Sequence, residues 1–503
     1  MKRATTTLAA AALLALLGGA APAQPIDVGG RRELFVDRYL IGKLTGARLV
    51  MHAPQPAPPP AKPLLTVGRF GGYVYGTVFR DGEVYRLYGR RERGKALPNS
   101  APRDKRWFNQ VTCYAESPDG INWTEPDLGI YDNVPEIKAG NVTFAWEFGA
   151  THNFTPFLDT NPAAPATQRY KAVGGSRTVK DPKLLAKYGV GGLRGYVSAD
   201  AVRWKRLRDE PIIPNEWGAF DSQNLAFWSE AERCYVCYFR VFDNRHSRGV
   251  RSVRRSTSKD FLHWTKPVDV RMNRPRPGGP NRYRHRMEQL YVNNIKPYFR
   301  APHIYIGLPT RVNFDRNAPA ECLLMTSRDG VNFDRTFTDV FCRPGAAGSY
   351  GNRGHYLANH LIQTGPAELS VYNYNGRRWT LRLDGLASLN APFAGGQMVT
   401  RPLTFKGDRL EINARTAGIG FIRVEVQDAE GKPIEGYALA ACRPMTGDEV
   451  AHEVSWKAGA DVSRLSGKRV RLRFVMKDAD VYSLRFVPVP KAVPGQRRRG
   501  NTS

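Results

Sequence analysis

Short runs of alternating apolar and polar residues, separated by turn residues, fill most of the chain. From residue 64 to residue 391 a two-part pattern recurs five times: an opening strand leads into a hairpin with aromatic residues, and a serine–aspartate turn follows in all but the last unit. Strands that bury one face of an antiparallel sheet alternate in this way. The pattern predicts an all-β protein with five small sheets in residues 64–391.

The turn Ser117–Trp123, with the sequence Ser-Pro-Asp-Gly-Ile-Asn-Trp, is the clearest repeated feature. Asp-Gly supplies the positive φ angles of a tight turn, and the serine can bond to local backbone. Altered copies begin at Ser198, Ser256 and Ser327, roughly one four-stranded sheet apart. Repeats of this kind predict a propeller, and five units predict a five-bladed β-propeller.

The residues on either side of the five units have different sequence patterns. Residues 396–488 contain short alternating strands at the spacing of a β-sandwich domain. Residues 24–63 contain an early strand and a proline-rich segment that is expected to lie extended on the surface. The basic tail, residues 489–503, is expected to be disordered.

Residues 1–23 have the three parts of a secretory signal peptide. Lys2 and Arg3 precede an apolar run from Leu8 to Leu17, and Ala21-Pro22-Ala23 is a small-residue cleavage site. The apolar run is short for a membrane span. The mature protein is therefore expected to be secreted or periplasmic.

The chain carries 75 Lys and Arg against 46 Asp and Glu, a formal charge of +29. This excess indicates either a generally solvated basic surface or a polyanionic partner. No nucleic-acid-binding motif accompanies it, so an acidic or sulfated glycan is the better candidate partner.

Cys234 and Cys237 are three apart on a predicted strand and face opposite sides, which argues against a shared metal or a redox pair.

Five units with Ser-x-Asp-Gly-x-x-Trp hairpins, followed by a β-sandwich, resemble the secreted five-bladed propeller glycoside hydrolases of families 32, 43 and 68. The resemblance covers residues 64–488 and implies a glycosidase with its site in the axial funnel. The chain lacks the Asn-Asp-Pro-Asn-Gly and Arg-Asp-Pro motifs of the invertase group, and Asn153 stands where the arabinanase group has an aspartate. An axial Ca²⁺ is implied by the resemblance alone; the sequence itself indicates no metal site or cofactor.

Glycoside hydrolysis generally needs two carboxyl groups, and the first residues of innermost strands converge on a propeller axis. Asp221 opens a polar Asp-Ser-Gln-Asn run, and Glu288 follows an arginine-rich stretch that suits a base or nucleophile. We predict these two as the catalytic pair, with Glu368 assisting; Asp37 is a fourth candidate. A hydrogen-bonding Asp221 and a salt-bridged Glu288 are the structural alternatives.

Polar and cationic residues near the same strands are candidate substrate contacts: His152, Asn153, Asn224, Arg240, Arg300 and His360. Arginines concentrated within residues 240–255 and 271–286 would form a basic rim for an anionic glycan, or else solvated loops. The sequence thus predicts a glycosidase acting on a polysaccharide or oligosaccharide. The alternative is a non-catalytic glycan-binding propeller.

Overall fold

The computed structural model describes residues 24–58, 73–92, 109–137, 140–147, 149–176, 182–243, 250–272, 289–312, 320–337, 339–343, 356–373 and 377–489. Regular structure in these residues is almost entirely strand, with one short α-helix, α2 (Pro182–Tyr188). The all-β class predicted from the alternation is confirmed. The signal peptide and nearly all of the basic tail lie outside the described residues.

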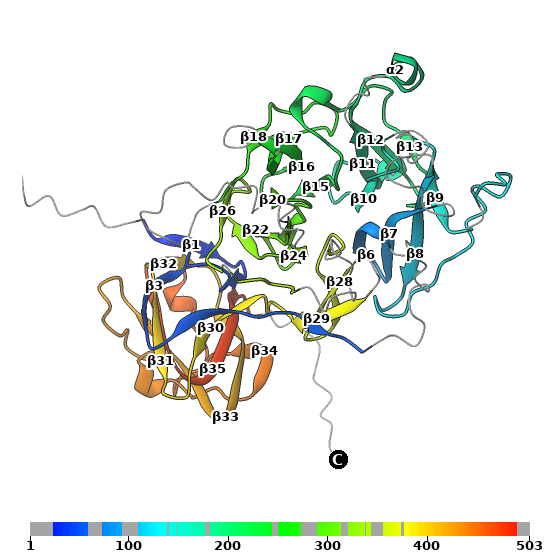
Figure 1. Ribbon diagram of the computed structural model, residues 1–503. Helices are drawn as coiled ribbons and strands as arrows, with labels where there is room; N and C mark the ends of the chain where they lie inside the picture. The colour runs from blue at the N-terminus through cyan, green and yellow to red at the C-terminus, as the bar shows by residue number, and fades with distance from the viewer. Residues whose placement is uncertain are drawn as a thin grey trace, which may run out of the picture.

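Five sheets, antiparallel except for one parallel strand pair in the fourth, follow one another along the chain and surround a common centre (Figure 1). The first contains β6 (Val74–Asp81), β7 (Val84–Glu92), β8 (Gln110–Ser117) and β9 (Val142–Ala145). The second contains β10 (Thr155–Leu158), β11 (Tyr170–Ser176), β12 (Gly192–Ser198), β13 (Lys205–Arg206) and β14 (Ile213–Pro214). The third contains β15 (Leu225–Ser229), β16 (Cys234–Asp243), β17 (Val250–Ser258) and β18 (Val268–Asp269).

The fourth sheet contains β21 (Ile295–Tyr298), β22 (Ala301–Gly307), β25 (Met325–Ser327), β26 (Asn332–Asp334) and β19 (Arg271–Met272). The fifth contains β27 (Ile362–Gly365), β28 (Glu368–Tyr372), β29 (Arg378–Arg382) and β5 (Gln55–Pro56). A further three-stranded sheet, which the sequence did not predict, contains β20 (Gln289–Leu290), β23 (Thr310–Val312) and β24 (Glu321–Cys322). The opening strands of the five sheets, β6, β10, β15, β21 and β27, lie innermost against their neighbours.

The fifth sheet is completed by a strand from the other end of the chain. Gln55 pairs with Thr380 and Pro56 with Trp379. Both β5 residues are exposed, as expected for a surface segment. Proline has no N–H to donate, so an edge position is the place in a sheet that tolerates it. The described part of the proline-rich segment therefore serves as an edge strand.

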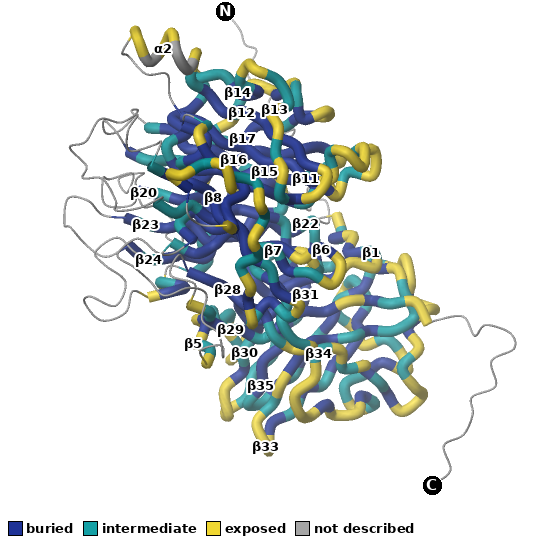
Figure 2. The backbone as a smooth tube through the Cα atoms, turned by 90° about the vertical axis from the view of Figure 1, so that its right-hand side faces the viewer, coloured by how far each residue is buried: buried dark blue, intermediate teal, exposed yellow. Residues whose placement is uncertain are grey.

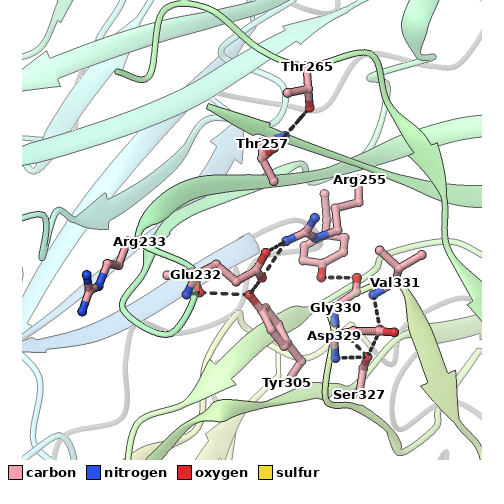
Figure 3. Close-up of polar contacts among 12 residues, drawn as sticks. Glu232, Arg233, Arg255, Thr257, Thr265, Tyr305, Ser327, Asp329, Gly330 and Val331 are labelled. Atoms are coloured by element: carbon pink, nitrogen blue, oxygen red, sulfur yellow. Dashed lines mark hydrogen bonds and ion pairs between the residues drawn. The ribbon is translucent and has the colours of Figure 1, made fainter. Parts of the chain in front are cut away.

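The four serine–aspartate turns share one hydrogen-bonding geometry. In the first, the Asp119 carboxylate accepts the backbone N–H groups of Ile121 and Asn122, each at 2.7 Å. Burial acts in the opposite direction, but these donors lower the pKa of Asp119 to about 2. Figure 3 shows the same arrangement at Asp329. In the third turn the capping serine is Ser258 rather than the predicted Ser256.

A second group of strands comes from both ends of the chain. One eight-stranded sheet contains β2 (Glu33–Leu34), β3 (Ile41–Thr45), β4 (Arg48–Met51), β30 (Ala387–Ala391), β31 (Gly396–Thr400), β33 (Arg409–Gln427), β34 (Asp448–Glu453) and β35 (Arg471–Val487). Beside it β1 (Ile26–Gly29) pairs in parallel with β32 (Leu403–Phe405). Their core includes Val424, Trp456 and Phe474, and Figure 2 shows buried backbone running through these strands and the five sheets.

A buried carboxylate joins the two groups of strands. Asp384, fully buried at the β29–β30 turn, accepts hydrogen bonds from Arg300 (3.0 Å) and Ser483 (2.7 Å), and Arg32 lies 3.5 Å from it. Arg300, predicted as a substrate contact, therefore belongs to this junction. Asp37, the fourth carboxyl candidate, is likewise held at the junction by Arg328 at 3.0 Å.

Replacing Asp384 tests this junction. Asn has almost the same shape and also tolerates the positive φ of 62° found there. Asp384→Asn removes the charge beside the buried Arg32 and the partly buried Arg300 and replaces one acceptor oxygen by an NH2 group, and we expect it to lower the free energy of unfolding by about 3 kcal/mol in denaturant titrations. The control is Asp448→Asn. Asp448 forms its ion pair with Arg382 at the surface, so the expected loss of unfolding free energy is below about 1 kcal/mol. Equal losses would contradict the junction's role.

Gly120 tests the contact between the first and fifth sheets. It has a φ of 71°, and an added Cβ would lie 3.0 Å from Thr364 and 3.1 Å from Ile362 in β27. Gly82 has a similar φ of 61° with nothing within 4 Å. We expect Gly82→Ala to cost roughly 1 kcal/mol of unfolding free energy from backbone strain alone, and Gly120→Ala clearly more. Equal costs would mean that the turn does not pack on β27.

Candidate functional site

The innermost strands run in the same direction through the centre. Gln223, before β15, donates to the carbonyls of Tyr75 and Gly76 at the start of β6. Asn294, before β21, donates to the carbonyl of Leu357 ahead of β27. The first residues of these strands therefore gather at one end of the centre, which we call the strand-start end.

Asp221 lies at the strand-start end. Its side chain is 34% exposed, and its Oδ1 is 3.1 Å from Nη1 of Arg240, a β16 side chain only 2% exposed. The Arg240 guanidinium also donates to the backbone carbonyl of Tyr291 and lies 4.4 Å from the centre of the Tyr291 ring. A buried guanidinium therefore fixes a carboxylate that solvent can reach, and this combination is suited to a binding or catalytic role.

Three tyrosines extend from Arg240 toward the first sheet. The ring of Tyr291 is 5.4 Å from that of Tyr356, and Tyr356 is 6.2 Å from Tyr75. Arg251 of β17 lies 5.5 Å from the Tyr291 ring, and burial and the neighbouring Arg240 lower its pKa. Burial and the Tyr291 ring beside it raise the pKa of Tyr75. The strand-start end thus combines cationic groups with aromatic rings.

His152 lies on the far side of the tyrosines. Its ring is 5.7 Å from Tyr75, and its Nδ1 is 2.8 Å from Nη1 of Arg90 and 2.9 Å from Oε1 of Gln110. Gln110 in turn donates to the Glu92 carboxylate at 3.1 Å. A continuous set of contacts therefore connects Asp221 with a second carboxylate, Glu92, at the same end.

Asn153 and Asn224 lie at this end but act structurally. The Asn153 side chain donates to the carbonyls of Gly175 and Phe220 and accepts the Gly175 N–H at 2.9 Å. Asn224 donates to the carbonyls of Phe220 and Ser222. Both are buried, so backbone groups use their hydrogen-bonding capacity.

Glu368 is not on an innermost strand. It begins β28, the second strand of its sheet, after the hairpin that ends β27. Its carboxylate accepts hydrogen bonds from Thr364 and Arg378, each at 2.7 Å. Glu368 is therefore separated from Asp221 by the length of β27. Glu288 lies outside the described residues.

His360 lies toward the other end of the centre. It follows Asn359, whose backbone N–H donates to Gly76, and its Nε2 contacts Nζ of Lys296. Of the predicted site residues, the structure brings Asp221, Arg240 and His152 to the strand-start end. It places Arg300, Glu368 and His360 elsewhere.

The arginines of residues 240–255 divide between two roles. Arg240 and Arg251 are at the candidate site, whereas Arg254 pairs with Asp269 and Arg255 with Glu232 (Figure 3). Arg245 and Arg248 are outside the described residues, as is most of the second arginine cluster. Cys234 and Cys237 are buried in β16 and are not bonded to each other.

The axis contains carboxamides whose oxygens have no hydrogen-bond partner in the described part: Gln223, Asn294 and Asn359. Calcium sites in proteins use six to eight oxygens, usually including carboxylates. The described residues contain no group of three His, Cys, Asp or Glu that could hold a metal. Asn294 and Asn359 line a cavity of about 40 Å³, which suits a water molecule. These neutral amide oxygens, with no carboxylate among them, do not fit the Ca²⁺ that the resemblance implied.

Sequence reasoning missed Arg90, Tyr75, Tyr291 and Tyr356. Tyr75 was visible as the first residue of a predicted innermost strand, which is the signal that could have found it. Arg90 lies on a second strand, and Tyr291 and Tyr356 lie in connecting segments. Their convergence depends on how the sheets pack around the centre.

No family model matches the chain, and no curated protein matches it. Solved structures do. A family 43 arabinoxylan arabinofuranohydrolase from Bacillus subtilis has a TM-score of 0.38 and 12% identity over 83% of this chain and 96% of its own. A family 32 β-fructofuranosidase from Bombyx mori has a TM-score of 0.36 and 11% identity over 88% of this chain and 95% of its own. An N-acetylgalactosamine deacetylase from F. plautii has a TM-score of 0.39 and 10% identity over 86% of this chain and 96% of its own.

Glycoside hydrolases of families 32 and 43 are thus among the structures to which the chain is similar, as the turn sequences predicted. Identities this low identify no catalytic residue, so the site is judged from its own geometry. Within the described ranges, no helix is long and apolar enough to cross a lipid bilayer.

Replacing Asn153 by a charged residue of the same shape tests its structural role. Asn153→Asp keeps the shape but removes both N–H donors and buries a carboxylate, and we expect it to lower the unfolding free energy by about 3 kcal/mol or more. Asn133→Asp, at an exposed turn position, is the control, with an expected loss under about 1 kcal/mol. A stable Asn153→Asp variant with new hydrolytic activity would instead assign the position to catalysis.

Proposed function

We propose that this protein is a glycoside hydrolase whose active site lies at the strand-start end of the innermost strands. The supporting observation is Asp221, a solvent-accessible carboxylate fixed by the buried guanidinium of Arg240. The Tyr291 ring lies beside this ion pair, and the half-buried Tyr291 and Tyr356 would offer ring faces and hydroxyl groups to a sugar, with the buried Tyr75 packed behind Tyr356.

Asp221 would act as the base or nucleophile. Its ion pair holds the side chain in a fixed orientation, and a carboxylate so placed stabilises the positive charge of an oxocarbenium-like transition state. The general acid would be Glu92, which Gln110 and Asn109 hold at the same end, or Glu288, the other member of the pair predicted from the sequence, where its arginine-rich surroundings favoured a base or nucleophile. A carboxyl separation of about 5 Å would give retention of configuration, and one of roughly 6.5–9.5 Å inversion.

The substrate would be an anionic polysaccharide or oligosaccharide. Arg90, Arg240 and Arg251 lie around the tyrosines, and burial and the like charge of Arg240 lower the pKa of Arg251. A carboxylate or sulfate group on the glycan would relieve this repulsion and accept paired hydrogen bonds. The net charge of +29 would favour the approach of such a substrate.

The architecture that we propose is a five-bladed propeller, residues 64–391, with a C-terminal β-sandwich that recruits the N-terminal strands. The five sheets and their neighbouring innermost strands support the blades. Residues 1–23 support export to the periplasm or the medium, where a polysaccharide hydrolase would meet its substrate.

Activity assays on neutral, uronic-acid-containing and sulfated glycans test the proposal. We expect Asp221→Asn to reduce kcat by roughly a hundredfold or more while the fold persists, and Glu288→Gln or Glu92→Gln to do the same if that residue is the acid. Asp448→Asn, on the distant surface, should retain wild-type activity. Full activity of Asp221→Asn would reject this site.

A non-catalytic glycan-binding protein is the second candidate. The observation in its favour is that Asp221 is already committed to an ion pair, as carboxylates often are in binding sites. The same glycan series distinguishes the two functions. Binding that Asp221→Asn weakens, without turnover by the wild type, would indicate the binding protein.

A further inference from the structure

A second cavity lies at the opposite end of the innermost strands. It has a volume of about 410 Å³ and is lined by residues at or near the ends of β6, β10, β15 and β21, and by residues in and just before β27. Its wall is largely aromatic, with Phe79, Phe157, Trp228 and Tyr298, and its polar lining includes Lys296 and His360. Cavities of this size hold small-molecule ligands in many proteins.

Lys296 is a buried lysine in this cavity with an unusual set of neighbours. It lies on β21 and is 7% exposed, its Nζ contacts Nε2 of His360, and it lies 5.7 Å from the centre of the Phe227 ring. Within the described residues no carboxylate forms an ion pair with it. A buried ammonium group is normally paired, so this lysine lacks the partner that its charged form requires.

The electrostatics of the pair agree with this geometry. Burial lowers the pKa of Lys296 well below its usual value, and burial together with Lys296 lowers that of His360. The other charged groups of the cavity are Arg80 and Glu230, and Arg80 is bonded to Glu83. The phenol of Tyr298 donates to Asp384. An anion placed between Lys296 and His360 would favour their protonation.

We propose that this cavity binds a small organic carboxylate with an apolar body, its carboxylate against Lys296 and His360 and its body against Phe157 and Trp228. The ligand chemistry follows from the lining: two adjacent nitrogen bases surrounded by aromatic carbon, with no described carboxylate bonded to either of them, although Glu230 also lines the cavity. The cavity is separate from Asp221 and does not depend on the proposed glycosidase activity.

Calorimetry on the full chain tests the proposal with benzoate as the probe. We expect saturable binding of benzoate and at least tenfold weaker binding of benzyl alcohol, which has the same ring without the charge. Titrations in two buffers with different ionisation heats should show an uptake of about one proton per benzoate, because the bound anion charges the Lys296–His360 pair. Trp228 supplies an independent fluorescence signal.

Variants locate the site. Lys296→Met keeps the length of the side chain and removes the amine, and we expect at least a tenfold loss of benzoate affinity; His360→Gln should reduce the proton uptake. Lys43→Met, at an exposed position on β3, is the control for charge. Asp221→Asn should leave benzoate affinity within about twofold, which distinguishes this site from the proposed active site.

Four outcomes would overturn the proposal: equal affinity for benzoate and benzyl alcohol, no binding of benzoate, binding without proton uptake, or unchanged affinity in Lys296→Met. Preference for glucuronate over benzoate would also overturn it, since a sugar acid lacks the apolar body. If Lys296→Met fails to fold, the proton uptake of the wild type and its reduction in His360→Gln still decide.

Discussion

The convergence of the innermost strands on one centre is the constraint on which the rest of this structure depends. Side chains must close that centre and still satisfy the backbone groups that face it. Gln223 does so across the middle, donating to the carbonyls of Tyr75 and Gly76 at 2.9 and 3.0 Å. Asn153 and Asn294 make equivalent connections between neighbouring sheets. A carboxamide can donate and accept without a charge, so it connects strands here without a counter-ion.

Because neutral groups close the middle, the two ends of the centre have different chemistry. At the strand-start end, Arg240 is paired with Asp221, and Arg90 with His152 and the Tyr75 ring. At the other end, the Lys296 amine meets only another base and aromatic carbon among the described residues. The arginine at the strand-start end orients a carboxylate of the protein, whereas the proposed ligand would supply the carboxylate at the Lys296 end. Two sites on one set of strands can therefore serve two kinds of ligand.

The repeated turns could be read from the sequence because they are local. Ser117, Asp119 and Gly120 bond within a few residues, so the residue types predict the geometry. A position for Asp221 at the start of an innermost strand could be read from the sequence for a similar reason, since a polar run precedes an apolar strand there; its catalytic role stays a prediction. The roles of Asn153 and Asn224 could not be predicted, because a buried carboxamide that holds backbone and one that binds a sugar have the same sequence signature.

The remaining errors concern long-range pairing. Nothing in the local pattern shows that β5 completes a sheet with β29, or that β3 and β4 join strands some 340 residues later. Arg300 was predicted at the funnel because its sequence position is next to an innermost strand. The charge that holds it, Asp384, is 84 residues away and is recognisable only after the two groups of strands have docked.

The distribution of cations also refines the meaning of the net charge. Some arginines are paired internally, Arg255 with Glu232 and Arg328 with Glu33 and Asp37, and these pairs already cancel within the sum that gives +29. The remaining excess of positive charge favours anions in general but does not say where on the protein they bind. At the two ends of the centre, cationic side chains lie in buried or half-buried positions: Arg240, which pairs with Asp221, Arg251 close to it, and Lys296 beside His360. A charge in a partly buried position interacts strongly with a ligand, because little solvent screens it. The position of these few side chains, together with the overall excess of positive charge, is therefore the basis for proposing anionic ligands at the two ends.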